Sequence, residues 1–192
     1  TDGVITHNQH MATWLEKNGL KVPVSTLGIF DYDNDHTLTG GHLYDRSVCF
    51  AGNLEKAPFF EKIRLTQAKL KIFGANPANV YQEGVTYVGQ YTPNELLDHM
   101  DQNFGLVWDG TSLDGCNGRY GEYLKFNNPH KTSLYLSCGI PVIIWKEAAL
   151  ADFVEEHKVG ITLNSLADLD KVLMETSADD YKIMRTNAMK LA

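Results

Sequence analysis

The sequence predicts an α/β fold built around a doubly wound, mostly parallel β-sheet. Short apolar segments alternate with amphipathic ones along the chain, a rhythm typical of strand–helix–strand crossovers. The segment 142–145 is apolar at every position, as expected of a strand that helices cover on both faces. With 43% hydrophobic and 21% charged residues, the 192-residue chain can bury a core and does not belong to the disordered class.

Each predicted strand is a short apolar run. The chain opens with one such run at Val4 and Ile5. Further strands are predicted at residues 48–51, 70–74, 85–88, 106–108, 142–145 and 161–163. Ligands of a parallel sheet bind at the carboxyl ends of its strands. The loops to search therefore follow Ala51, Val88, Trp108 and Trp145.

The predicted helices place apolar residues at helical spacing between these strands. The best-defined helix begins after Thr92, because a hydroxyl cap, Pro93 at the first helical position and Glu95 three residues after the cap all agree. Its buried face is predicted to carry Leu96, Leu97, Met100 and Phe104. Other helices are expected at residues 59–68, from 129 onward, and in spans that begin near 150, 166 and 181.

The charge balance argues against nucleic-acid and membrane partners. Acidic residues number 24 and basic residues 17, giving a formal net charge of −7, which disfavours broad binding to phosphate backbones or anionic lipid. The longest apolar run, 140–145, is far too short to span a bilayer. We therefore expect no nucleic-acid partner and no integral membrane segment.

Cysteine usage indicates a reducing compartment. Cys49, Cys116 and Cys138 form no Cys-x-x-Cys pair and leave one thiol without a mate. This pattern is typical of reduced thiols in a cytoplasmic protein, so we predict no disulfide framework and no zinc site.

The two ends of the chain lead us to expect a piece of a longer protein, with trimmed or disordered termini as the alternative. It begins without Met inside a predicted strand and stops at Ala192 inside a helical pattern, whereas complete domains usually finish on a cap or a polar tail. The stretch from Asp31 to Asp45 is polar and irregular. We expect it to link a short N-terminal segment to the main α/β unit.

The segment 125–131 is the strongest candidate for a phosphate site. Asn128 is predicted to cap a helix and Pro129 to be its first residue. The free N–H groups of that helix start would then lie beside Lys125, His130 and Lys131, and helix N-termini bind phosphate. An ordinary capped helix with solvated lysines is the alternative. The candidate nucleotide-binding residues here are Lys125, Phe126, Asn127, Asn128, Pro129, His130 and Lys131.

Two other strand ends carry weaker candidates. Gly52 and Asn53 follow the strand 48–51, and a glycine there lets a ligand approach the backbone. Lys56 could add a cation, although it could equally be a plain surface lysine. Tyr91 lies just past another strand, where its ring could stack on a base or simply cover a helix end.

The loop 109–123 completes the set of candidates. It is long and rich in glycine and polar residues, and loops of this length are uncommon unless they are functional or disordered. Arg119 and Tyr120 could reach a ligand from it or face solvent.

Several of these segments together resemble a known family. The pattern Pro129-x-Lys131-x-x-x-Tyr135-Leu136-x-x-Gly139-x-Pro141-Val142-Ile143 is similar to the nucleotide-sugar signature of GT-B glycosyltransferases. Segments 50–54, 106–110, 127–131 and 145–153 resemble the bacterial glucosyltransferases of serine-rich-repeat adhesin glycosylation. They also resemble the galactofuranosyltransferase-like proteins of capsule or exopolysaccharide loci. The match runs over most of residues 46–192.

The resemblance implies the C-terminal half of a GT-B fold, with two Rossmann-like domains facing each other across a cleft. Residues 1–35 would be the end of the acceptor-side domain, 36–45 a linker, and 46–192 the nucleotide-sugar-binding domain. A glycan or glycoprotein acceptor would bind through the domain that this chain lacks. The isolated chain would then be inactive, and the full-length protein is expected to be a homo-oligomer.

The implied reaction is hexosyl transfer from a UDP-sugar, UDP-glucose or UDP-galactose, which is a co-substrate, so no cofactor is expected. Lys125, Lys131 and the N–H groups after Asn128 would stabilise the diphosphate leaving group without a metal. One departure leaves the stereochemistry open: no Glu-x7-Glu pair precedes Gly139, and the glutamates with that spacing, Glu147 and Glu155, lie after it. The general base is expected outside this chain.

Two other classes of protein compete with this interpretation. The segment 28–33 and the acidic run Asp31, Asp33 and Asp35 suggest a haloacid-dehalogenase-type phosphatase or a metal-binding Asp-x-Asp. We interpret the run as a solvated acidic turn, because such short motifs match often by chance. A non-catalytic α/β module that binds a partner is the third possibility, and it predicts no nucleotide binding.

Overall fold

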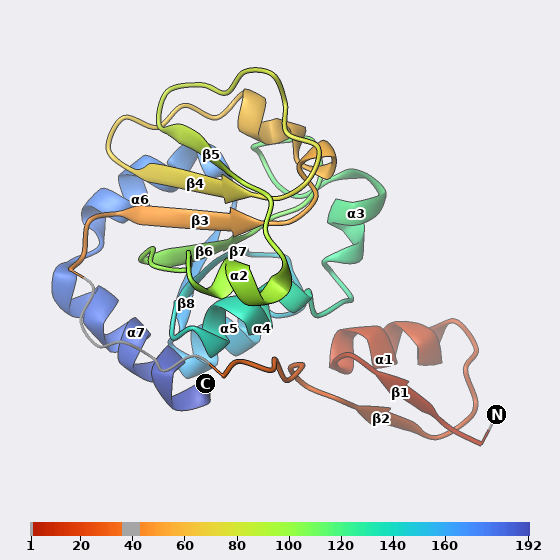
Figure 1. Ribbon diagram of the computed structural model, residues 1–192. Helices are drawn as coiled ribbons and strands as arrows, with labels where there is room; N and C mark the ends of the chain where they lie inside the picture. The colour runs from red at the N-terminus through yellow and green to blue at the C-terminus, as the bar shows by residue number, and fades with distance from the viewer. Residues whose placement is uncertain (1, 36–42) are drawn as a thin grey trace.

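The computed structural model describes residues 2–35 and 43–192, which form two parallel sheets (Figure 1). The strands are β1 (Val4–Thr6), β2 (Val24–Thr26), β3 (Ser47–Ala51), β4 (Lys69–Phe73), β5 (Val85–Gly89), β6 (Phe104–Val107), β7 (Val142–Trp145) and β8 (Gly160–Leu163). The α-helices are α1 (Gln9–Lys17), α2 (Pro93–Leu97), α3 (Gly118–Tyr123), α4 (His130–Ser137), α5 (Ala151–His157), α6 (Leu169–Glu175) and α7 (Ala178–Leu191).

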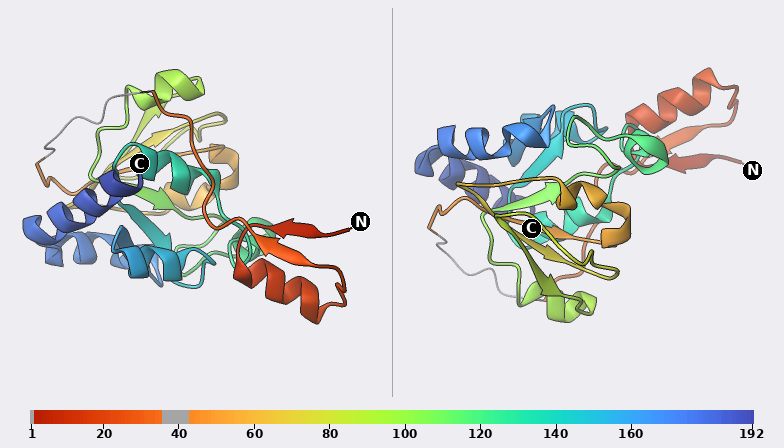
Figure 2. Two further views of the ribbon diagram at one scale, coloured as in Figure 1. Left: turned by 90° about the horizontal axis from the view of Figure 1, so that it is seen from below. Right: turned by 90° about the horizontal axis from the view of Figure 1, so that it is seen from above.

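The N-terminal residues form one strand–helix–strand unit. Strand β1 pairs in parallel with β2, with Val4 opposite Val24, which confirms the strand predicted at the start of the chain. Asn8 caps α1, because its Oδ1 accepts the N–H of Met11 at 3.0 Å. Both views in Figure 2 show this unit projecting from one end of the larger sheet.

The larger sheet has the order β5-β4-β3-β6-β7-β8, and every neighbouring pair is parallel. This confirms the predicted doubly wound sheet. The chain winds outward from β3 to β5, returns to the middle as β6, and winds outward again to β8. The strand order therefore reverses between β3 and β6. In open α/β sheets that reversal leaves a crevice at the carboxyl ends of the two central strands.

The helix predicted at residues 59–68 is wrong. Two 3-10 helices, Leu54–Lys56 and Pro58–Glu61, occupy part of this region instead. Phe59, Phe60 and Leu65 are all buried, and an α-helix would have pointed Leu65 away from the other two. A one-faced helix cannot bury all of them, whereas an irregular chain can.

The helix predicted to start after Thr92 is confirmed, but it is shorter than its pattern suggested. Thr92 Oγ1 accepts the N–H of Glu95 at 3.4 Å, and Glu95 Oε2 accepts the N–H of Thr92 at 2.9 Å, which is a full capping box. The helix ends at Leu97. Phe104, expected on its buried face, is instead the first residue of β6.

The predicted linker lies partly outside the described residues, since 36–42 are not described. Residues 29–35 have no regular secondary structure, yet they contact the larger sheet's helices. Asn34 Nδ2 donates to the carbonyl oxygen of Ser137 in α4 at 2.9 Å. The division of the chain at 35 and 46 stays a prediction. In the described residues no helix is long and apolar enough to cross a membrane.

One buried tyrosine holds the central strands apart. Strands β3 and β6 pair only at Val48 with Phe104 and at Cys49 with Gly105. Beyond that point the N–H of Ala51 donates to the hydroxyl of Tyr135 in α4 at 2.8 Å. The ring of Tyr135 lies so close to Gly105 that a Cβ there would approach it to 2.2 Å, which only glycine avoids. Tyr135 therefore fixes α4 against the crevice.

We expect Tyr135→Phe to lower the free energy of unfolding by about 1–3 kcal/mol, because it leaves the buried N–H of Ala51 without a partner. Urea denaturation measures this change. Tyr123→Phe is the matched control: Tyr123 is 49% exposed, and its change should stay within about 0.5 kcal/mol. Equal stability of the Tyr135→Phe and wild-type proteins would contradict the assigned role.

Candidate functional site

The candidate site is the crevice between the carboxyl ends of β3 and β6, and Lys131 of α4 lies in it. Its Nζ is 3.0 Å from Asp109 Oδ1 and 3.5 Å from the carbonyl oxygen of Trp108, both just past β6. The same ammonium is 4.4 Å from the centre of the Phe50 ring in β3. The side chain of Lys131 is only 14% exposed. One cation is therefore fixed between the two strands where the sheet reverses.

Asp109 is a candidate site residue that the sequence analysis did not single out. Its carboxylate neutralises Lys131, and any anionic ligand must compete with it for the ammonium. Two signals pointed to it: its position directly after a strand that ends at the switch point, and its place in the segment 106–110 that carries the family resemblance. Sequence reasoning had treated the whole loop 109–123 as one candidate without singling out its first residue.

The start of α4 can bind an anion, although its capping differs from the prediction. Pro129 is the N-cap and His130 the first helical residue, and no side chain caps the helix. Among the described residues, five buried side-chain polar atoms have no hydrogen-bond partner, and three of them flank this turn: Asn127 Oδ1, Thr132 Oγ1 and Ser133 Oγ. A buried polar atom requires a partner. This turn therefore offers N–H groups that no side chain caps, beside buried polar atoms that lack a partner.

The prediction that Asn128 caps this helix is wrong, because its side chain binds the N-terminal unit instead. Asn128 Oδ1 accepts from Asn8 Nδ2 at 2.6 Å. Its Nδ2 donates to the carbonyl oxygens of His7, at 2.9 Å, and Gly28. Its backbone N–H donates to His7 Nδ1 at 3.1 Å. Asn128 is 2% exposed and thus ties the ends of β1 and β2 to the loop before α4.

Other residues of the predicted segment also contact the N-terminal unit. The carbonyl oxygen of Phe126 accepts from Asn8 Nδ2 at 3.0 Å, and the Phe126 ring lies 5.8 Å from that of Trp14. The ring of His130 stacks on Phe30 at 4.5 Å and 12°. The segment 125–131 is therefore a junction as well as a candidate ligand loop.

Lys125 lies apart from Lys131, on the outside of this loop. Its Nζ is 3.1 Å from Glu122 Oε2 and 3.3 Å from Glu147 Oε2, and it lies 5.2 Å from the centre of the Trp145 ring. The hydrogen bond to Glu122, followed by that to Glu147, raises the pKa of Lys125. The two lysines that the sequence placed in one cradle are thus held by different carboxylates.

Gly52, Asn53 and Tyr91 come together at a hollow of about 270 Å³ beside the carboxyl ends of β3, β4 and β5. Asn53 Oδ1 accepts from the N–H of Glu55 and from Asn76 Nδ2, each at 3.1 Å. The Tyr91 ring packs on His99 at 4.1 Å. Both side chains therefore already have structural partners, which is the alternative that the sequence left open for Tyr91.

Lys56 and Tyr120, which lie far apart in the sequence, are brought into contact. The Lys56 ammonium lies 4.5 Å from the centre of the Tyr120 ring, which α3 carries. The loop between β6 and α3 is ordered by Asn117, whose Oδ1 accepts the N–H of Thr111 at 2.7 Å. The two candidates from separate loops are thus neighbours.

The features that suggested a phosphatase or a metal belong to the N-terminal part of the chain. Residues 28–33 follow β2 of the two-stranded sheet, and not a strand of the six-stranded sheet. Within residues 2–35 and 43–192, no group of three or more His, Cys, Asp or Glu side chains could hold a metal ion.

A family model decides the relationship of this chain to known proteins. Residues 48–192 match the model described as "Glucosyltransferase 3-like, C-terminal domain". The chain belongs to this family. The matched region contains all of the six-stranded sheet except Ser47, the first residue of β3. It also contains every predicted nucleotide-binding residue, from Gly52 to Lys131.

Curated relatives extend the similarity to the N-terminal unit. The chain is 36% identical over 192 residues to the beta-1,6-galactofuranosyltransferase WbbI of Escherichia coli (strain K12), with 97% of this chain and 57% of WbbI covered. It is 26% identical over 195 residues to glucosyltransferase 3 of Streptococcus gordonii, with 100% of this chain and 57% of the relative covered. The chain thus spans just over half the length of these relatives.

Solved structures show the same fold at low identity. Sucrose-phosphate synthase (tll1590) from Thermosynechococcus elongatus matches with a TM-score of 0.59 and 15% identity over 100% of this chain and 54% of that one. A mutant of S. aureus TarM, in complex with Fondaparinux, alpha-GlcNAc-glycerol and UDP, matches with a TM-score of 0.55 and 15% identity over 98% of this chain and 41% of that one. The parallel sheet with flanking helices is the Rossmann-like fold of GT-B glycosyltransferases.

We expect Asn128→Ala to lower the free energy of unfolding by about 2–4 kcal/mol, because it strips buried partners from Asn8 and from two carbonyl oxygens, at roughly 1–3 kcal/mol for each group left unpaired. Asn127→Ala is the control one residue away, since Asn127 Oδ1 has no partner to lose. Its cost should stay below about 1 kcal/mol. Chemical denaturation of both variants compares the two, and similar losses would contradict the role of Asn128.

Acid should weaken the same junction through His7. Burial, and then the charge of His130, lowers the pKa of His7 below its usual 6.5, and His7 Nδ1 must stay unprotonated to accept the N–H of Asn128. The unfolded chain then binds this proton more readily, so the stability from His7 is present above pH 6.5 and is lost as the pH falls below it.

The melting temperature of the wild-type chain should therefore fall between about pH 7.5 and pH 5.5 by more than that of His7→Gln, which keeps a neutral acceptor. His157→Gln, at an exposed position of α5, should retain the full wild-type fall. A His7→Gln protein that loses as much stability as the wild type would show that another group is responsible.

Proposed function

We propose that this chain is the donor-binding half of a GT-B hexosyltransferase that transfers a sugar from a UDP-sugar. The observation that carries the proposal is Lys131, held by Asp109 at the crevice where β3 and β6 diverge. Membership of the glucosyltransferase 3-like family supports sugar transfer as the reaction. Because the chain spans 57% of its curated relatives, we expect the activity to belong to the longer protein and the isolated chain to be inactive.

Solved structures of similar fold support uridine diphosphate as the carrier of the donated sugar. The TarM mutant was solved with UDP, and a DNA-modifying beta-glucosyltransferase that matches this fold at a TM-score of 0.56 was studied with uridine diphosphoglucose. The named curated relatives transfer galactofuranosyl or glucosyl groups, to judge by their names. A donor of the UDP-glucose or UDP-galactose class fits both observations.

The proposed chemistry is electrostatic. As the bond from the sugar to the diphosphate breaks, negative charge grows on the leaving oxygen, and a preorganised cation stabilises it. Lys131 is preorganised by its contacts with β3 and β6, and the diphosphate would displace Asp109 from it. The uncapped N–H groups at the start of α4 would bind the second phosphoryl group. Lys56 and Lys125 lie further out as additional cations, and no metal is needed.

The remaining features of the proposal concern the whole protein. A glycan or glycoprotein acceptor would bind through the part of the protein that this chain lacks, and the general base would come from there. We propose a homo-oligomer in the cytoplasm. A non-catalytic partner-binding module is the competing function, and it predicts no response to UDP.

Calorimetry with UDP tests the donor site. We expect Lys131→Ala to weaken UDP binding by about 10- to 100-fold, because charge-assisted hydrogen bonds contribute roughly 1.5–3 kcal/mol. Lys190→Ala removes an exposed lysine at the end of α7 and should bind UDP like the wild type. Undiminished affinity in Lys131→Ala would overturn the site assignment, and absence of binding to the wild type would favour the partner-binding module.

The same titration tests metal independence. Affinity for UDP should be unchanged when EDTA replaces Mg²⁺ or Mn²⁺, because fixed cations already neutralise the diphosphate. Tight binding that requires the divalent ion would show that the metal-free mechanism is wrong.

A further inference from the structure

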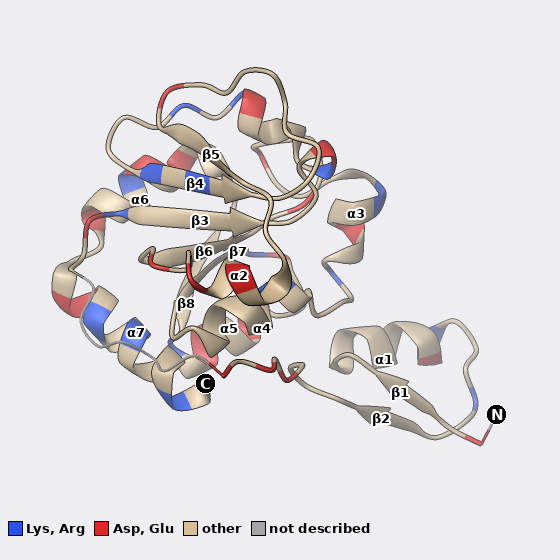
Figure 3. Ribbon diagram, in the orientation of Figure 1, with Lys and Arg blue, Asp and Glu red and all other residues tan. Residues whose placement is uncertain are grey.

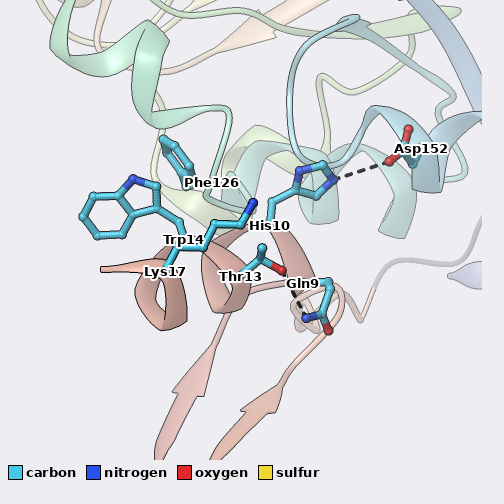
Figure 4. Close-up of a pocket in the computed structure, with 7 residues that line it drawn as sticks. All are labelled: Gln9, His10, Thr13, Trp14, Lys17, Phe126 and Asp152. Atoms are coloured by element: carbon cyan, nitrogen blue, oxygen red, sulfur yellow. Dashed lines mark hydrogen bonds and ion pairs between the residues drawn. The ribbon is translucent and has the colours of Figure 1, made fainter. Parts of the chain in front are cut away.

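A groove separate from the Lys131 crevice runs between α1 and the start of α5. It has a volume of about 480 Å³, which is within the range of ligand pockets. Figure 4 shows Trp14 and Phe126 at one end and His10 with Asp152 at the other. Gln9, Thr13 and Lys17 line the rest.

The aromatic end of the groove is an accessible platform. Trp14 is 49% exposed although it is the largest side chain of α1. Its ring is tilted at 60° to Phe126 with 5.8 Å between ring centres. On the other side of this pair lies a second hollow of about 460 Å³, lined in part by Tyr123 and Arg119. The pair therefore lines both hollows, and Tyr123 adds a third aromatic ring on the far side.

The other end of the groove offers hydrogen-bonding groups that are only loosely engaged. His10 Nε2 lies 3.4 Å from Asp152 Oδ2, and Gln9 Nε2 lies 3.4 Å from Thr13 Oγ1. Contacts this long at an exposed surface are readily exchanged for bonds to a ligand. An imidazole, a carboxylate, an amide and a hydroxyl together can donate to and accept from several hydroxyl groups.

The charges of the groove do not favour a second diphosphate site. Asp152 is 84% exposed and would repel phosphate. The charged residues of α1 lie at its C-terminal end (Figure 3), and of these Lys17 also lines the groove, so the groove carries one charge of each sign. A neutral ligand with an apolar face and many hydroxyls fits this surface. Sugars have that character, because their C–H faces carry slight positive charge and pack on the negative face of an aromatic ring.

We infer that this groove binds one further sugar unit of the glycan acceptor, beyond the portion that the missing part of the protein would hold, with Trp14 and Phe126 as the stacking platform and His10 and Asp152 as hydroxyl-binding groups. The inference rests on the proposed function, since it assigns the acceptor side of that reaction. Phe126 belongs to both regions: its ring lines the groove, and it precedes the helix that carries Lys131. Asn8 fixes the arrangement by capping α1 and bonding to the carbonyl oxygen of Phe126.

Nuclear magnetic resonance of the tryptophan indole N–H groups tests the inference on this 192-residue chain. The chain has three tryptophans, and Trp108 and Trp145 are 0% and 5% exposed, so Trp14 reports on the groove separately. The probes are methyl α-glucoside, methyl β-galactoside and methyl β-N-acetylglucosaminide at up to about 10 mM, because ligands of this size bind with Kd on the order of 1 mM. At least one should shift the Trp14 signal saturably. No shift with any probe overturns the inference.

Variants separate stacking from general surface effects. Trp14→Ala should weaken binding of the glycoside that shifts the Trp14 signal by about tenfold or more, and Trp14→Phe should restore most of the affinity. Because these variants lack the Trp14 signal, binding is measured by saturation transfer to the glycoside's own resonances. Asp152→Asn leaves the helix packing intact and should weaken binding by about three- to tenfold. Met174→Ala removes an equally exposed apolar side chain from α6, away from α1 in Figure 1, and should change nothing. Unchanged binding in both Trp14→Ala and Asp152→Asn overturns the inference.

A parallel titration with UDP keeps this inference distinct from the proposed donor site. UDP and the sugar should bind independently. Sugar binding without UDP binding would remove the donor proposal alone, and UDP binding without sugar binding would remove the groove alone. Displacement of the sugar by UDP would show that the groove belongs to the nucleotide site and would overturn the inference.

Discussion

The divergence of β3 and β6 is the constraint on which the rest of the structure depends. Strand β3 begins one half of the sheet and β6 begins the other, and the two halves are built outward in opposite directions. The two strands therefore pair at only two registered positions and separate at their carboxyl ends. Tyr135 satisfies the backbone that this separation exposes, and Gly105 leaves room for its ring. The same helix then delivers Lys131 into the gap. Fold and candidate site thus share one cause.

The residues before α4 serve a second purpose that the strand order alone does not imply. Asn128 joins the ends of both N-terminal strands to this loop through buried hydrogen bonds. On one side of the loop lies the Lys131–Asp109 ion pair, and on the other the groove with Trp14 and Phe126. A short segment therefore separates the two surfaces to which we assign, as proposals, a diphosphate and a polyhydroxylated ligand.

Local patterns predicted what local forces determine. The continuous apolar runs and the Thr92 capping box identified strands and a helix start, because their signals lie within a few residues. Asn128 was misassigned because Asn before Pro fits a local capping rule, while its actual partner His7 lies 121 residues away. The prediction of a helix at 59–68 was wrong for a similar reason, because tertiary burial of apolar residues on more than one side overrode the helical propensity of the segment. The pairing of Asp109 with Lys131 has no sequence signature, because it joins two loops only once the sheet has formed.

The ion pair in the crevice also determines how an anion can enter. The side chain of Lys131 is only 14% exposed, and burying its ammonium without a counterion would be costly. Asp109 supplies that counterion from within the protein. Binding of a diphosphate then replaces one oxyanion, the Asp109 carboxylate, with another. Binding at an exposed basic surface would instead release small counterions into solution. If Lys131 binds the donor as we propose, that binding should be less sensitive to ionic strength than binding to an exposed lysine patch, and the protein avoids presenting a bare cation to unrelated polyanions.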